Sequence, residues 1–529
     1  MNNNISDILL SQLSERISQQ MGLVFAEKNW SSFKRGLSSA AEDFGFSDTD
    51  ACGRWLLESP LTRERIKTLA CHLTIGETYF FRETKAFAAL QEQVLPAIFF
   101  SRQGTDRRLR IWTAGCSTGE EPYSIAILLT RMLPNIHEWK ISILATDVNP
   151  HSLQKAMDGT YSEWSFRSPP EWLKSQYFTK QGKRYEIIPR IKRMVSFESL
   201  NLAEDVYPSL SNGTNAMDII FCRNVMMYFS RQLQDRIIQK FHHALVEGGW
   251  LIVSPSEASS ALFPQFTTIN FPGAIFFMKS KERPDIQEQW LVRTPFETAA
   301  PLLQSPQSPQ IPQLSEEVMP VFGFPPPTVA EAPPFPTQIP QISPKPVEAG
   351  PGNVLSKGTT AAVPPAPQHP EDPYDEAAAL YEQGRYREVI ALLEHHPKSP
   401  KKGCISDLLA RAHANQGEFA EALAWCDKAL AVEVLNPGYH YLRATILQEQ
   451  EQLDEAAKTL RKVLFIDPDF VLAYFALGNL HRQLGKIQES KKNFENVRKL
   501  LQSHAPGDVL PESDGITAAR LQEIVMAML

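Results

Sequence analysis

Apolar residues near the N-terminus follow a helical period. One face of a helix is marked by apolar residues at every fourth position: Leu9, Leu13, Ile17 and Met21. The dipeptide Ser59-Pro60 interrupts the helical pattern, and LTRERIKTLACHL begins a further helix after it. We therefore expect a small all-α domain over residues 1–85.

Between residues 86 and 283, short apolar runs alternate with helical patterns. We expect strands at LRIWTA, ISILATD, AMDIIFC and GGWLIV, and helices at IAILLTRML, NPHSLQKAM and RQLQDRIIQKFHHAL. FTTINF and GAIFFMK predict a final hairpin. Strands that alternate with helices form crossover units on a mostly parallel sheet. This part is therefore expected to be an α/β, Rossmann-like domain whose strand-to-helix loops meet at one edge, where ligands bind.

The region from residue 373 to 505 reads as helical and repetitive. One position recurs in steps of 33, 34 and 34 residues, and it is occupied by Gly384, Gly417, Glu451 and Gly485. This period resembles the tetratricopeptide repeat, in which paired helices stack into a solenoid. An unrelated array of helical hairpins is the alternative. Glu451 stands where a turn glycine is expected, which predicts a less regular turn. A helical tail is expected over residues 506–529.

Proline marks the boundary before these repeats. Of the 40 prolines in the chain, 20 lie between Pro295 and Pro370. Such a segment favours extended, partly stiff conformations and cannot bury a core. We expect a disordered, proline-rich linker over residues 284–372, acting as a tether or as a docking site for a proline-reading partner.

Composition narrows the class of protein. Lys+Arg 53 against Asp+Glu 60 gives a net charge of −7, which disfavours a general nucleic-acid binder. The six cysteines contain no C-x-x-C pair, so we expect reduced thiols and no metal site. No apolar run approaches the ~18 residues of a membrane span, and no secretory signal is visible. The expected location is the cytoplasm, without membrane insertion.

The loop AGCSTGEE, which follows the first predicted strand, carries candidate chemistry. Its two glycines allow the backbone to approach a ligand closely, but no third glycine completes the dinucleotide pattern G-x-G-x-x-G. Glu120 and Glu121 stand where a pyrophosphate would lie, and they would repel it. Acidic residues suit a cationic or zwitterionic ligand instead. S-adenosylmethionine, which carries a sulfonium and an ammonium group, is such a ligand.

The loops after the next two strands carry further candidates. Asp147 ends the second strand, where a carboxylate can accept hydrogen bonds from both hydroxyls of a ribose. The alternative is that Asp147 or Asn149 caps the helix that follows. Arg223 ends the third strand, and a buried arginine needs an anionic partner. That partner is either a substrate carboxylate or a structural carboxylate such as Glu198.

Several motifs together resemble one family. A stretch before the sheet, LTIGETYFFRE, has three consecutive aromatics that suit core packing as well as a site. GETYFFRE, AGCSTGEEPYS, ATDVNP, SLNL and FCRNVMMYF, in this order, resemble the CheR chemotaxis methyltransferases over residues 10–283. The resemblance implies a small helical domain joined to a Rossmann-like domain. It also implies methyl transfer from S-adenosylmethionine to glutamate side chains of chemoreceptors, leaving S-adenosylhomocysteine.

The resemblance also implies roles for particular residues. Cofactor contacts are implied for nine positions: Gly76, Thr78, Arg82, Glu120, Asp147, Asn201, Leu202, Arg223 and Asn224. Asp147 would hold the ribose, and Asn201 and Leu202 would lie beside the adenine. The family usually has asparagine in place of Gly76, and glycine cannot supply that side-chain contact. Arg223 and Tyr228 would be catalytic by orienting the acceptor carboxylate.

The expected partners are proteins. They are the cytoplasmic helical methylation region of chemoreceptors and an unidentified protein that binds the repeats. Arg63 and Lys67 share a helix face that meets receptor helices or is simply solvated beside Glu64. The resemblance also implies a small antiparallel insertion at about 164–195. Its short loop TKQGKR predicts no dependence on a receptor C-terminal peptide.

Two other functions share these features. The chain could be an S-adenosylmethionine-binding scaffold in which the repeats are the main interaction module. It could also be a methyltransferase that acts on another protein, a small molecule or RNA.

Overall fold

The computed structural model describes residues 5–102, 107–167, 170, 172–204, 206–210, 212–280, 373–394, 401–513 and 515–529. The expected proline-rich linker, residues 284–372, lies outside these ranges. In the described ranges, no helix has the length and apolar character needed to cross a membrane.

Four helices form the N-terminal part: α1 (Asp7–Met21), α2 (Trp30–Asp43), α3 (Thr49–Glu58) and α4 (Arg63–Leu73). Side chains cap three of them, because Ser6, Asp48 and Thr62 accept hydrogen bonds from backbone N–H groups of the first turns of α1, α3 and α4. The four apolar residues at helical spacing on α1 are all buried, as the sequence predicted. They share one core with Phe33 and Leu37 of α2.

The next part is built on a seven-stranded sheet. Its strands are β1 (Arg108–Ala114), β2 (Lys140–Asp147), β6 (Val195–Ser199), β7 (Met217–Phe221), β8 (Leu245–Ile252), β9 (Thr267–Phe271) and β10 (Ala274–Met278). The strand order is β6-β2-β1-β7-β8-β10-β9. Neighbours from β6 to β8 run parallel, whereas β10 is antiparallel to β8 and β9. This confirms the Rossmann-like prediction. The strand β6 was not predicted.

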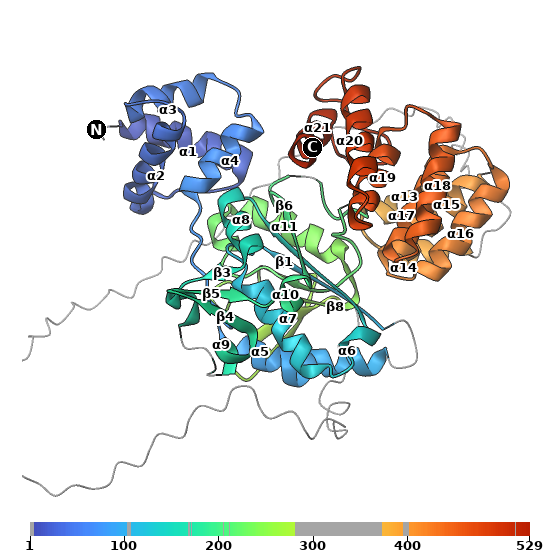
Figure 1. The fold of residues 1–529 in the computed structure, drawn as a ribbon, viewed down its shortest axis with the longest axis horizontal. Coiled ribbons are helices and arrows are strands. Elements are labelled where there is room, and N and C mark those ends of the chain that lie inside the picture. Colours follow the sequence, from blue (N-terminus) through green and yellow to red (C-terminus); the bar gives the residue numbers. More distant parts are fainter. Residues whose placement is uncertain are drawn as a thin grey trace, which may run out of the picture. The chain divides into compact units, whose positions relative to one another are not determined.

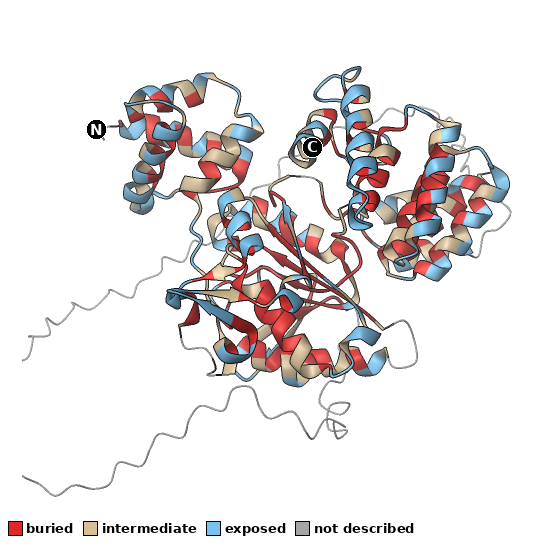
Figure 2. Ribbon diagram, in the orientation of Figure 1, coloured by how far each residue is buried: buried red, intermediate tan, exposed pale blue. Residues whose placement is uncertain are grey.

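Helices cover both faces of this sheet (Figure 1). They are α5 (Thr84–Ala89), η2 (Leu90–Val94), α6 (Leu95–Ser101), α7 (Glu120–Met132), α8 (Pro150–Asp158) and α11 (Arg231–Ala244). Neighbouring residues of β1 enter different cores, since Ile111 packs with α7 and Trp112 packs with α11. Figure 2 shows the central strands in the colour of buried residues, and every residue of β1 is buried. The sheet therefore presents only its strand ends to ligands.

A three-stranded antiparallel sheet with the order β3-β5-β4 lies between α8 and β6 in the chain. Its strands are β3 (Thr160–Tyr161), β4 (Phe178–Gln181) and β5 (Arg184–Ile187). Short helical segments flank it: η4 (Glu163–Phe166), α9 (Trp172–Tyr177) and α10 (Pro189–Lys192). Further single turns are η1 (Glu27–Asn29), η3 (Ile136–Glu138) and η5 (Met226–Tyr228).

In the part of the repeat region that the structure describes, eight helices form the repeats. They are α13 (Pro373–Glu382), α14 (Tyr386–Glu394), α15 (Lys402–Asn415), α16 (Phe419–Val432), α17 (Pro437–Glu449), α18 (Leu453–Ile466), α19 (Val471–Gln483) and α20 (Ile487–Leu501). The turn residues Gly384, Gly417 and Gly485 have φ values of 69°, 76° and 73°. Glu451 adopts the same left-handed conformation, with φ of 62°. The predicted irregularity of this turn is therefore wrong, because the glutamate accepts a conformation that costs roughly 1–2 kcal/mol.

The tail is helical only in its last part, α21 (Ala518–Met528). Before it, the chain folds back on itself, and the Leu510 N–H donates to the Ile516 carbonyl at 3.0 Å. The Ala518 N–H closes this arm by donating to the Asp508 carbonyl at 2.8 Å. Leu510 and Ile516 are buried in the core of the last repeats. The arm, residues 508–513 and 515–518, thus packs as part of the repeat region.

Candidate functional site

A cavity of about 290 Å³ lies at the carboxyl ends of β1, β2 and β7. Segments within residues 115–152 and 200–229 supply its floor and one wall. The rest comes from residues between 21 and 32 and between 72 and 82, in and after the N-terminal helices, and from Phe87 of α5. In the sheet, β2 and β6 lie on one side of β1, and β7 and β8 lie on the other. The cavity is therefore at the point where the strand order reverses, which is where α/β sheets bind ligands.

The loop between β1 and α7 needs its glycines. Gly115 and Gly119 have φ values of 78° and 90°, a conformation that other residues adopt only with strain. A Cβ on Gly119 would also lie 2.8 Å from the Ala156 Cβ, so this glycine lets α8 approach closely. The backbone N–H groups of Gly115 and Cys116 both donate to the Thr146 carbonyl, at 2.8 and 2.9 Å. The loop is thereby held in place beside β2.

Asp147 lines the cavity, is half-buried and accepts hydrogen bonds from two backbone donors. Its Oδ2 accepts from the Ser117 N–H at 2.8 Å, and its Oδ1 accepts from the Asn149 N–H at 2.8 Å. Burial raises the pKa of Asp147, and these backbone hydrogen bonds lower it in part. The following helix is capped by Asn149, whose Oδ1 accepts from the His151 and Ser152 N–H groups. The remaining lone pairs of the Asp147 carboxylate can therefore accept hydrogen bonds from a ligand.

The two adjacent glutamates of the glycine loop have different surroundings. Glu121 lines the cavity, whereas Glu120 is buried outside the lining. The Glu120 carboxylate accepts from Thr118 Oγ1 at 2.6 Å and from Ser165 Oγ at 2.9 Å. Burial raises the pKa of both carboxyl groups. A cofactor contact of Glu120, as the resemblance implied, stays a prediction, and Glu121 is the carboxylate of this pair that the structure brings to the cavity.

Arg223 is the centre of a buried ion cluster. Its Nη1 lies 2.9 Å from Glu121 Oε2, its Nη2 lies 2.9 Å from Glu83 Oε2, and it donates to the Arg82 carbonyl at 2.6 Å. Only 2% of its side chain is exposed. Burial alone would lower the pKa of Arg223, but the two carboxylates raise it. The anionic partner is therefore not Glu198, the structural carboxylate that the sequence suggested.

A carboxylate that the sequence gave no reason to single out holds the next turn. Glu257 Oε2 accepts from the Asn224 N–H at 2.7 Å, from Ser254 Oγ at 2.6 Å and from the Ser254 N–H at 3.3 Å. Its Oε1 accepts from the Met227 N–H at 3.3 Å. Asn224 has a φ of 59°, which is a left-handed conformation. Glu257 thus fixes the turn that connects Arg223 to Tyr228.

Tyr228 is half-buried at the cavity, and burial raises the pKa of its hydroxyl. Its carbonyl accepts from the Val24 N–H at 2.8 Å, and Leu23 forms an antiparallel bridge with Phe229. The N-terminal part is therefore paired by its backbone to the loop that carries the predicted catalytic tyrosine.

The segment before the sheet contributes Gly76, Thr78 and Arg82 to the lining. Cofactor contacts of these residues, which the resemblance implied, stay a prediction. Arg82 donates to the Glu77 carbonyl at 2.8 Å. A Cβ on Gly76 would lie 3.1 Å from Ser117 Oγ, a tight but adjustable contact. Of the aromatics in this stretch, Phe80 and Phe81 are in the core.

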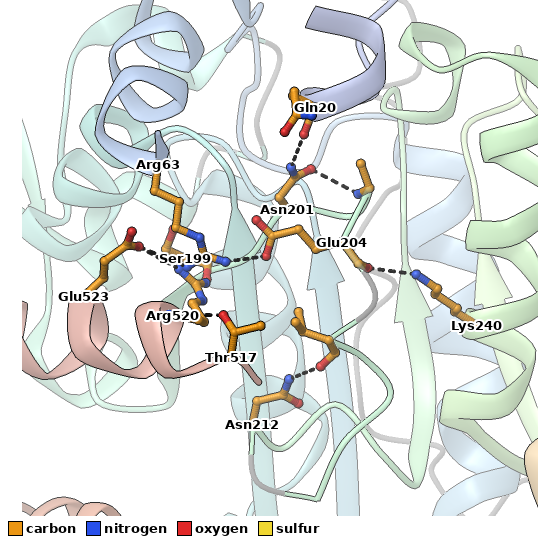
Figure 3. Close-up of polar contacts among 12 residues, drawn as sticks. Gln20, Arg63, Ser199, Asn201, Glu204, Asn212, Lys240, Thr517, Arg520 and Glu523 are labelled. Atoms are coloured by element: carbon orange, nitrogen blue, oxygen red, sulfur yellow. Dashed lines mark hydrogen bonds and ion pairs between the residues drawn. The ribbon is translucent and has the colours of Figure 1, made fainter. Parts of the chain in front are cut away.

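Asn201 and Leu202 line the cavity after β6. The Asn201 amide donates to the Gln20 carbonyl at 3.2 Å and its Oδ1 accepts from the Ala203 N–H at 3.0 Å (Figure 3). The strand end before them is held from outside, because Arg520 of α21 donates to the Ser199 carbonyl at 3.2 Å. Helix α21 thus contacts the end of β6, just before the cavity residues Asn201 and Leu202.

Arg63 is not free to meet a receptor in this arrangement. Its Nη2 lies 2.6 Å from Glu204 Oε2, and its Nη1 lies 3.4 Å from Glu523 Oε2 of α21 (Figure 3). Burial raises the pKa of both Glu204 and Glu523, and the charge of Arg63 opposes that rise. The basic face predicted for α4 is therefore occupied, at Arg63, by carboxylates of the same chain.

The residues of the cavity fit S-adenosylmethionine. Asp147 and Glu121 give it carboxylates for a cationic ligand, and Gly115, Cys116 and Ser117 of the loop after β1 line it with small residues. Among the described residues, no group of three or more His, Cys, Asp or Glu side chains is arranged to hold a metal ion.

Comparison with known proteins agrees with this fit. A family model described as "CheR methyltransferase, SAM binding domain" matches residues 76–274. Models described as "Tetratricopeptide repeat" and "TPR repeat" match residues 407–438 and 444–485. The repeats predicted from the 34-residue period are confirmed.

Curated relatives are similar over the first half of the chain. A chemotaxis protein methyltransferase of Borreliella burgdorferi is 33% identical over 260 residues, covering 49% of this chain and 90% of the relative. A probable chemotaxis protein methyltransferase of Rhizobium etli is 36% identical over 209 residues, covering 39% and 76%. Chemotaxis protein methyltransferase 1 of Pseudomonas aeruginosa is 35% identical over 213 residues, covering 39% and 75%.

Proposed function

The chain belongs to the CheR family of chemotaxis protein methyltransferases, and from this premise we propose that it methylates glutamate side chains of chemoreceptors. It is an S-adenosylmethionine-dependent methyltransferase. The proposed products are a glutamate methyl ester in the receptor and S-adenosylhomocysteine. The proposed location is the cytoplasm, where the helical methylation region of such receptors lies.

One observation carries the proposal. The cavity brings the half-buried carboxylate of Asp147 together with the loop that runs from Arg223 to Tyr228. The first is suited to the donor, because it offers free lone pairs at the end of β2. The second is suited to an acceptor, because a tyrosine hydroxyl can donate a hydrogen bond to a carboxylate.

Methyl transfer to a glutamate carboxylate requires that donor and acceptor are aligned, and it requires no proton relay. A glutamate side chain has a reference pKa of about 4.3, so it is ionised at neutral pH and needs no general base. When bound, S-adenosylmethionine supplies a methyl group that a carboxylate oxygen can accept directly. The residues of this chain then have two tasks, namely to orient the acceptor oxygen and to keep water out.

The ion pairs of Arg223 suggest different roles for Arg223 and Tyr228, the two residues predicted to be catalytic. Because Glu83 and Glu121 already pair with Arg223, an acceptor carboxylate would have to compete with both. We therefore assign Arg223 the positioning of the loop and of Glu121, and we assign Tyr228 the contact with the acceptor. This differs from the expectation that Arg223 contacts the acceptor itself.

The test is methyl transfer by the full-length chain. The chain is incubated with methyl-labelled S-adenosylmethionine and receptor-rich membranes, and base-labile label in the receptor band reports glutamate esters. Tyr228→Phe should lower kcat by about tenfold or more, since one hydrogen bond to a charged group is worth roughly 1.5–3 kcal/mol. Tyr474→Phe, in the repeats, is the matched control.

Two outcomes would contradict the proposal. Label that is stable to base would exclude an ester, and label in another protein or in RNA would identify a different acceptor. Donor binding without any transfer in a single turnover would favour the scaffold function.

A further inference from the structure

The repeats hold a carboxylate in a site that methyl transfer does not use. Arg411, on α15, donates from its Nε to Asp407 Oδ2 at 2.8 Å. On the other side of the guanidinium, its Nη2 pairs with Glu512, which comes from the arm that precedes α21. The Arg411 side chain is only 19% exposed, so this ion pair is well shielded from water.

The first turn of α17 forms the other side of this site. Asn436 caps the helix, Pro437 follows, and the buried Gly438 is next to the Glu512 carboxylate. A Cβ on Gly438 would lie 2.9 Å from Glu512 Oε1, closer than real Cβ contacts come. The carboxylate therefore occupies the space left by the missing Cβ of Gly438, and an alanine there would displace it; the helix end also favours negative charge. We name Arg411, Asp407 and Gly438 the carboxylate site.

Asp407 adds an unused acceptor to the site. Its Oδ1 is buried and has no hydrogen-bond partner among the described residues. A buried carboxylate oxygen without a donor is unfavourable, and Glu512 cannot supply a proton to it. A ligand that brings a backbone N–H or a hydroxyl together with its carboxylate would satisfy both groups.

The residue that fills the carboxylate site is strained. Glu512 has a φ of 60°, a left-handed conformation that disfavours residues with a Cβ. The arm is held by the Leu510–Ile516 hydrogen bond, by burial of those two side chains, and by the buried Ser513, whose Oγ donates to the Ile516 carbonyl at 3.1 Å. The Glu512 side chain, at the tip of the arm, can therefore turn out of the site while the backbone of the arm stays in place.

We propose that the carboxylate site is a ligand site of the repeats for an acidic peptide, and that Glu512 occupies it in the absence of a partner. A glutamate of an incoming peptide in extended conformation makes the same ion pair without the left-handed backbone. It can also give its N–H groups to Asp407. The repeats would then select partners that carry an acidic residue. Because Glu512 competes for the same site, only a partner that binds more favourably than Glu512 would displace it.

The test uses the full-length chain and a tripeptide copied from the tip. Acetyl-Pro-Glu-Ser-amide is titrated by calorimetry into the wild-type chain and into Glu512→Gly, whose glycine suits the positive φ. We expect saturable binding to Glu512→Gly and binding at least about tenfold weaker to the wild type. The wild-type tip competes because it is already present at high effective concentration.

Two controls distinguish binding at the carboxylate site from nonspecific binding. Gly438→Ala, placed in the Glu512→Gly chain, adds a Cβ where the carboxylate would lie and should weaken binding at least about tenfold. This alanine favours the helix, so α17 is expected to remain folded, which circular dichroism checks. The tripeptide with Gln in place of Glu should not bind. No saturable binding to Glu512→Gly, or binding unaffected by either control, would overturn the proposal.

Discussion

Glu257→Gln is the change that best tests how the turn between Arg223 and Tyr228 is held. The carboxylate accepts four hydrogen bonds, three of them from the backbone of residues 224, 227 and 254. Glutamine has nearly the same shape but only one acceptor oxygen, and its amide nitrogen is a donor. If its oxygen takes the place of Oε2, the amide nitrogen faces the Met227 N–H.

The magnitude follows from this count. One hydrogen bond to a charged acceptor is lost, worth roughly 1.5–3 kcal/mol, and the other three change from charge-assisted to neutral bonds. The neutral amide is easier to bury than a charge, which offsets part of the loss. We expect the turn to lose about 2 kcal/mol of local stability, which is roughly a 30-fold rise in local opening.

Two measurements check this result. Amide hydrogen exchange at Asn224 and Met227 should become about 30-fold faster, with little change in the core strand β1. The value of kcat should fall by about 10–100-fold, because a small displacement of an orienting group costs that much. Glu92→Gln, at an exposed site, is the matched control. Unchanged exchange at the turn together with kcat within about twofold of wild type would refute the reasoning.

Three further outcomes follow from the structure. Asp147→Asn should weaken S-adenosylhomocysteine binding by about 10–100-fold in calorimetry, because bonds to a charged acceptor become neutral ones; an unchanged Kd would remove Asp147 from the site. Acidification should weaken that binding before an exposed aspartate would titrate, since burial raises the pKa of Asp147, and Asp147→Asn should abolish this dependence. Burial lowers the pKa of His242 to about 3 and of His243 to about 4. Folding therefore favours the neutral imidazoles, so their contribution to the free energy of unfolding should be complete above pH 6.5 and should be lost as the pH falls from 6.5 to about 3. If the urea midpoint falls as much over this range in His242→Gln as in the wild type, His242 makes no such contribution.

Much of the fold follows from local pattern. The strands β1, β2 and β7 are continuous apolar runs followed by helical periods, and such runs are hard to place anywhere but the centre of a parallel sheet. Their carboxyl ends meet by topology, which is why Asp147 and Arg223 could be expected at one cavity. The edge strand β6 escaped prediction because only Val195 is buried in it, and its sequence VSFES has no strong alternation.

The pairing of charges could not be read from the sequence. Glu83 and Glu121 are far from Arg223 in the chain, and any of several carboxylates could have been its partner. Glu120 and Glu121 are neighbours on a helix, where successive side chains point about 100° apart, and the sequence does not say which one faces the cavity. Glu257 stands near a strand end like the predicted residues, and its position after the predicted strand GGWLIV is the only signal that could have drawn attention to it.

The backbone pairing of Val24 with Tyr228 bears on how this enzyme must be assembled. The loop carrying the tyrosine gains one of its backbone partners from a segment more than two hundred positions earlier in the chain. An isolated sheet domain would present that carbonyl to solvent and would lack a whole wall of its pocket. The helices at the beginning of the chain are thus a component of the cavity, and any exchange of those helices would also reshape the site where we propose that methyl transfer takes place.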